Sequence, residues 1–218
     1  MIWVLAAAAA TASAALHQRF VVPRLPAPNL DEGETAPDYG ALAGARDVIG
    51  AAVLALLAAT LVLPGAGEPR LVLWTAYLGA GAALVWVDLR TTWLPRRLNQ
   101  LCLAQVLLGL VALGTTDWRA ALAGLAGGLA ALGLFHLVWR LGTGFGYGDV
   151  RLAAIVGVVA GSSGPQHWLT SILAGTSAGA LWAVAHTVGN RRRGGPAHFP
   201  YGPALWLGPV LATWLSGW

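Results

Sequence analysis

The sequence of 218 residues contains no lysine, a single cysteine and very little charge. Only 10% of its residues are charged, whereas a soluble domain usually carries about 25%. A soluble enzyme of this size needs a larger polar surface, so this composition excludes that class. The same shortage of charge, combined with 57% apolar residues, also excludes a disordered chain.

The scarcity of cysteine and of clustered basic residues excludes further classes. The single Cys102 rules out a disulfide framework and a cysteine-rich zinc site. The five histidines show no ligand spacing, so we expect no metal and no other cofactor. All 13 basic residues are Arg, and they are scattered along the chain. Nucleic acid is therefore not an expected partner, because binding it needs a dense basic stripe.

Long apolar runs, bounded by Arg, Pro, Gly or acidic residues, fill most of the chain. A membrane-spanning helix needs about 20 residues, so the runs predict an all-α, polytopic membrane helix bundle of about eight transmembrane helices. The expected spans are residues 1–16, 48–63, 71–87, 98–113, 120–139, 150–160, 168–188 and 201–218. The run at 150–160 is short for a span, which leaves a helix buried in protein or a re-entrant segment.

The chain divides into three expected parts. Residues 1–22 form an N-terminal transmembrane helix, residues 23–47 a short cytoplasmic loop without its own core, and residues 48–218 a membrane-embedded core. Eleven of the 13 Arg residues lie in alternate loops. Because basic loops stay in the cytoplasm, these loops are expected to be cytoplasmic, with both termini outside.

Two acidic residues stand apart from the others, which lie in loops. Asp88 ends the apolar run ALVWVD, and Asp149 lies between a glycine-rich stretch and the next run. A carboxylate at a membrane edge is costly and suggests a function. The structural alternative is that each one caps its helix or pairs with nearby Arg90 or Arg151.

The two aspartates together suggest a specific chemistry. Carboxyls held about 3 Å apart cannot both ionise easily, so they share a proton. One can take a proton from water while the other donates one to a carbonyl oxygen. Gly146 and Gly148, just before Asp149, would let backbone approach a partner helix or an extended substrate.

The segments VDLRTTWLPRRLN, GYGDVRL, FPYGPALWLG and RFVVPRLP all occur in this chain. Together they resemble the prepilin peptidases, a family of GxGD-type aspartyl proteases. VDLRTTWLPRRLN at 87–99 is similar to the family's first aspartate motif, with Pro seven residues after Asp. GYGDVRL at 146–152 is similar to its Gly-x-Gly-Asp-x-Lys-Leu motif, with Arg in the Lys position. FPYGPALWLG at 199–208 resembles its Pro-Phe-Gly-Pro segment, and RFVVPRLP at 19–26 its Arg-Leu-Pro.

The resemblance implies a membrane aspartyl endopeptidase that cuts the leader from prepilins or pseudopilins at the cytoplasmic face of the bacterial plasma (inner) membrane. It implies Asp88 and Asp149 as the catalytic pair. The residues that it implies as motif support are Pro95, Gly146, Gly148, Arg151 and Pro203. Many family members carry two Cys-x-x-Cys pairs in the first cytoplasmic loop and also methylate the product. That loop has no cysteine here, which implies a compact form without methyltransferase activity.

Two other interpretations stay open. In the first, the chain is a non-catalytic scaffold or transporter in which both aspartates pair with Arg. In the second, it is a presenilin-like or signal-peptide-peptidase-like protease, a class that shares Gly-x-Gly-Asp but carries Tyr before its first aspartate. Here Val87 precedes Asp88 and Pro95 follows it, which favours a prepilin peptidase.

Overall fold

The computed structural model describes residues 1–28, 36–142, 146–190 and 199–216. Helices make up most of these residues, and no strand occurs among them. The elements are α1 (Ile2–Leu16), η1 (His17–Val21), η2 (Val22–Arg24), η3 (Ala41–Ala43), α2 (Ala45–Val62), η4 (Glu68–Arg70), α3 (Leu71–Thr91), α4 (Arg96–Gly114), α5 (Trp118–Arg140), α6 (Tyr147–Ser162), α7 (Pro165–Asn190) and α8 (Gly202–Ser216). The predicted all-α fold class is confirmed.

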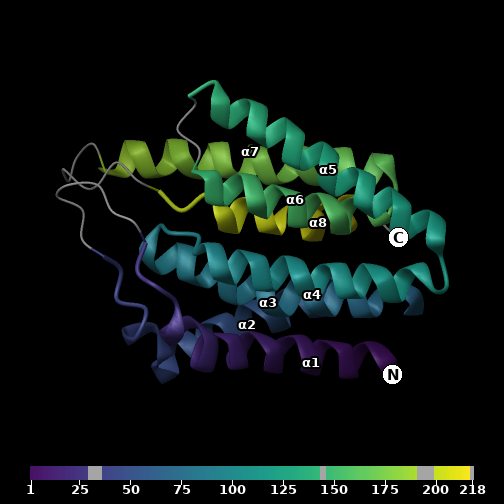
Figure 1. Cartoon of the computed structure of the whole chain (residues 1–218), viewed down its shortest axis with the longest axis horizontal. Helices are drawn as coiled ribbons and strands as arrows, with labels where there is room; N and C mark the ends of the chain where they lie inside the picture. Colours follow the sequence, from purple (N-terminus) through teal and green to yellow (C-terminus); the bar gives the residue numbers. More distant parts are fainter. Residues whose placement is uncertain (29–35, 143–145, 191–198, 217–218) are drawn as a thin grey trace.

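The helices lie roughly side by side, with α1 to α4 in one half of the bundle and α5 to α8 in the other (Figure 1). Helix α3 occupies the centre, since it contacts α1, α2, α4 and α8, and most of its side chains are buried. In the described part of the chain, five helices are long and apolar enough to cross a membrane: α2, α3 with η4, α4, α5 and α7. The protein is thus a multi-pass helical membrane bundle.

Helix α6 is longer than the apolar run that predicted it. The run covered residues 150–160, whereas the helix spans Tyr147–Ser162. The difference arises because Asp149 caps the helix from inside its first turn, so the polar residues before the run are helical too. At a rise of about 1.5 Å per residue, α6 is roughly 24 Å long. It packs against α4, α5, α7 and α8. Of the two alternatives for this short run, the structure therefore agrees with a helix buried in protein.

Glycines allow the backbones of α5 and α6 to touch. A Cβ atom at Gly157 would lie 2.5 Å from the Gly127 carbonyl oxygen, and one at Gly161 would lie 2.7 Å from that of Ala123. Small residues at such a seam increase van der Waals contact, which drives helix association in lipid. The seam fixes the position of α6 relative to α5.

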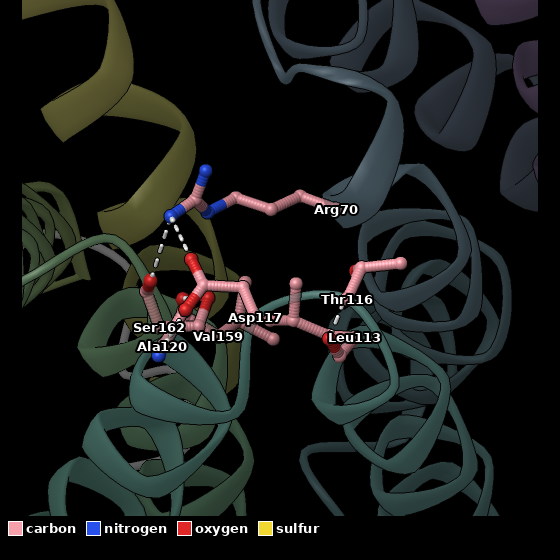
Figure 2. A network of polar contacts seen from close by, with 7 residues as sticks. All are labelled: Arg70, Leu113, Thr116, Asp117, Ala120, Val159 and Ser162. Carbon is pink, nitrogen blue, oxygen red and sulfur yellow. Dashed lines mark hydrogen bonds and ion pairs between the residues drawn. The ribbon is translucent and has the colours of Figure 1, made fainter.

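A polar network holds the end of the bundle where α4 turns into α5. Figure 2 shows the guanidinium of Arg70 reaching the Asp117 carboxylate, at 3.9 Å, and the Ser162 carbonyl oxygen, at 3.3 Å. The other oxygen of Asp117 accepts a hydrogen bond from the backbone N–H of Ala120 and caps α5. Three connections between helices are therefore tied together at this end.

The described part of the 23–47 loop packs against the bundle. The side-chain amide of Gln18 donates to the Leu42 carbonyl oxygen, and Tyr39 and Leu42 are buried in the common core. Residues 29–35, and with them three of the loop's acids, lie outside the described residues, as do Arg191, Arg192 and Arg193. The loop ends earlier than expected, because α2 begins at Ala45.

The glycine seam provides a test of the packing. Gly157→Ala should lower the free energy of unfolding by about 1–3 kcal/mol, because its Cβ meets backbone that cannot move aside. Gly133→Ala is the matched control, since a Cβ there meets nothing within 4 Å. Thermal unfolding in a mild detergent measures both. Equal stability of the two variants would contradict the close approach of α5 and α6.

Candidate active site

Four helix ends meet at the opposite end of the bundle from the Arg70 network: the C-terminus of α3 and the N-termini of α4, α6 and α8 (Figure 1). The backbone N–H of Gly202, which begins α8, donates to Asp88 on α3 at 2.9 Å. The side-chain amide of Asn99 on α4 donates to the Gly148 carbonyl oxygen on α6 at 3.4 Å. These contacts bring the three motif segments at 87–99, 146–152 and 199–208 together.

Asp88 lies in the last turn of α3 and is only 3% exposed. A carboxylate at a helix C-terminus is opposed by the helix dipole, and burial adds a desolvation cost. The N-terminus of α8 offsets part of this cost, since it directs the Gly202 N–H at Oδ2 of Asp88. The acid is thus held in an unfavourable place by a second helix.

Asp149 lies in the first turn of α6 and is partly exposed. Its Oδ2 accepts a hydrogen bond from the backbone N–H of Gly146, the N-cap residue, at 3.2 Å. This is the carboxylate half of a capping box. The structural alternative therefore holds in part, because Asp149 does cap its own helix.

The two carboxyls lie close enough for their charges to repel each other. Within the described residues, neither one is in an ion pair. Arg90 pairs instead with Asp47, with Nε and Oδ1 separated by 2.9 Å. Arg151 lies over the Tyr147 ring, 4.7 Å from its centre. The arginine pairs that the scaffold interpretation needs are thus absent from the described part of the site.

Asp47 is a buried acid that the sequence analysis misplaced. It was assigned to the 23–47 loop, but it lies in the first turn of α2 and is 5% exposed. Its Oδ1 accepts a hydrogen bond from the indole of Trp86 at 3.1 Å and pairs with Arg90. These contacts fix α2 against α3, which gives this acid a structural role.

The supporting residues predicted from the sequence gather around the pair. Pro95 is the N-cap of α4, and Pro203 is buried in the first turn of α8. A Cβ at Gly148 would lie 2.7 Å from Cβ of Leu94, so this glycine does allow a close approach. At Gly146 a Cβ would meet nothing nearer than 3.4 Å, so that position is not sterically required to be glycine.

Three further residues at the site were not singled out by the sequence analysis. A Cβ at Gly202 would lie 2.7 Å from Oδ2 of Asp88, so a larger residue there would displace the acid or the helix. Asn99 is 1% exposed, and its Oδ1 has no hydrogen-bond partner among the described residues. Burial and the charge of Asp149 raise the pKa of Tyr201 to about 12, so its phenol stays protonated. All three lie inside the quoted motif segments, which is the signal that could have identified them.

The residues of the site and the comparisons with known proteins bear on the class of protein. Among the described residues no cluster of three His, Cys, Asp or Glu side chains could hold a metal ion. No curated protein and no solved structure matches the chain. Residues 75–184, half of the chain, match the model of the type IV leader peptidase family, and this range contains both Asp88 and Asp149. The chain belongs to the type IV leader peptidase family.

Proposed function

We propose that the protein is an aspartyl endopeptidase that removes the leader peptide from prepilins or pseudopilins, with Asp88 and Asp149 as its catalytic pair. The observation that carries the proposal is the arrangement of these two carboxyls. They come from different helices, their charges interact, and no ion pair within the described residues neutralises either one. Membership of a leader peptidase family supports the reaction class.

The proposed mechanism uses the pair and one water molecule. One aspartate, ionised, takes a proton from water as the oxygen attacks the scissile carbonyl carbon, while the other, protonated, donates to the carbonyl oxygen. The tetrahedral intermediate then collapses, the C–N bond breaks, and a proton passes to the leaving amine. Backbone N–H groups hold Oδ2 of each carboxylate, which leaves Oδ1 of each for these proton transfers.

The proposed location is the plasma membrane of a bacterium, with the pair facing the cytoplasm. The uneven distribution of Arg between alternate loops supports this orientation. A leader that enters from the cytoplasm would reach the site as an extended segment, and Asp149 there is partly exposed. Methylation of the new N-terminus would need another protein, because residues 17–47 contain no cysteine for the zinc-binding loop.

Asparagine variants test the pair. Asp88→Asn and Asp149→Asn should each reduce cleavage of a co-expressed prepilin by at least about a thousandfold, because half of the pair cannot perform both proton transfers. The double variant should be no worse than either single variant. Immunoblotting of the processed and unprocessed pilin measures the effect.

Asp117→Asn is the matched control for these variants. It makes the same change at a helix end on the far side of the bundle, and an Asn side chain can still cap α5. This variant should cleave at the normal rate. Rapid cleavage by Asp88→Asn or Asp149→Asn at normal expression would make that acid structural and favour the scaffold interpretation.

Gly202→Ala tests the contact between α8 and Asp88. Its Cβ would lie 2.7 Å from the carboxylate oxygen, so either the helix or the acid must move. We expect kcat to fall by about a hundredfold or more, since a displacement of about 1 Å costs this much in a positioned site. Gly189→Ala, where a Cβ meets nothing within 4 Å, should have no effect. Normal kcat in Gly202→Ala would show that the N–H contact is dispensable.

Treatment with a zinc chelator tests whether cleavage is independent of zinc, as proposed for this compact form. With no cysteine in residues 17–47, purified protein should cleave a prepilin at an unchanged rate after treatment with a strong zinc chelator. Mass spectrometry of the product should show an unmethylated N-terminus even when S-adenosylmethionine is supplied. Loss of cleavage on chelation, or a gain of 14 Da in the product, would contradict this proposal.

A further inference from the structure

Two arginines lie at adjoining helix starts near the proposed catalytic pair. Arg96 begins α4 and Arg151 lies near the start of α6. These helix starts touch, since Asn99 bonds to the Gly148 carbonyl oxygen and Leu94 packs on Gly148. The charge of Arg96 acts on Arg151 as a repulsion. The sequence keeps this pair although like charges side by side destabilise a fold.

No carboxylate among the described residues neutralises the two arginines. Neither one is in an ion pair. Asp149 is two positions from Arg151 on α6, and residues with this spacing do not face each other on a helix. Its carboxylate is instead directed at Gly146. The Arg151 guanidinium lies over the face of Tyr147, and its side chain is partly exposed.

The surroundings of the pair add further positive potential. The N-terminus of α4 carries a partial positive charge, and its N-cap, Pro95, makes no side-chain hydrogen bond to it. The N-terminus of α6 lies beside it, and the Asp149 carboxylate that caps it offsets part of its dipole. Two arginines and the start of α4 thus lie at one edge of the bundle, an arrangement that favours an anion with several oxygens.

The neighbouring side chains place this edge at the membrane surface. Trp139 and Tyr147 pack edge to face, with ring centres 5.0 Å apart, and each is more than one third exposed. Aromatic rings of this kind gather at the headgroup level of a bilayer. Leu141 next to them is 71% exposed, which suits contact with acyl chains. An anion at this depth is most readily supplied by a lipid.

We propose that Arg96 and Arg151 form a binding site for the phosphodiester group of an anionic phospholipid. Each guanidinium donates to a phosphate oxygen, and the Trp139–Tyr147 pair and Leu141 contact the glycerol and the upper acyl chains. Basic pockets between membrane helices recognise headgroups in this way. The site extends beyond the proposed peptidase function, and its occupancy can be measured without any assay of cleavage.

Native mass spectrometry of the full-length protein in a neutral detergent tests the site. The probes are phosphatidylglycerol, phosphatidylcholine with the same acyl chains, and inorganic phosphate. We expect phosphatidylglycerol to bind at least tenfold more tightly than phosphatidylcholine. The double variant Arg96→Gln/Arg151→Gln should lose this preference, because charge-assisted hydrogen bonds contribute most of it.

Arg97→Gln/Arg140→Gln is the control, since it removes the same charge from exposed positions on α4 and α5. It should keep the preference. An equal loss in both double variants would overturn the proposal, because the attraction would then be a general property of the basic surface. Binding of inorganic phosphate as tight as that of the lipid would also overturn it. A normal lipid preference in Arg96→Gln/Arg151→Gln, combined with a raised KM for prepilin, would assign the arginines to the substrate instead.

Discussion

The hydrogen bond from the Gly202 N–H to Asp88 is the contact on which the site depends. Asp88 is buried at the C-terminus of α3, where the helix dipole opposes a negative charge. The N-terminus of α8, which donates this hydrogen bond, favours that charge. Glycine at the start of α8 permits this distance, since a Cβ there would lie 2.7 Å from Oδ2 of Asp88. The site therefore depends on residues far apart in the sequence, because α8 must pack against the central helix α3 for Asp88 to be held.

The charged groups at the two ends of the bundle have different partners. At one end Arg70 joins Asp117 and Ser162, so its charges are paired and the helix connections are tied (Figure 2). At the other end the helix starts of α4, α6 and α8 converge, and the acids there have backbone donors instead of cations. Pairing therefore stabilises the first end, while the second keeps two carboxyls that have no ion pair among the described residues.

The sequence predicts much of this arrangement because a membrane leaves few places for charge. Acidic residues beside apolar runs are scarce, and this scarcity singled out Asp88 and Asp149. The apolar runs themselves located the helices. Asp47 was misplaced because its partners, Trp86 and Arg90, lie about 40 positions away in the chain, and no local pattern reports such a contact. The start of α6 was placed too late, since a capping carboxylate makes polar residues helical where hydropathy indicates a loop.

The short length of α6 has a consequence for the depth of the reaction. Helix α7 has 26 residues against 16 for α6, a difference of roughly 15 Å at the usual rise. A tight turn joins the two helices at Ser162–Pro165, so the whole difference falls at the end that carries Asp149, as Figure 1 also shows. Asp149 is therefore set back from the level that the end of α7 reaches. In the proposed peptidase, the scissile bond and the attacking water would both have to reach this recessed level.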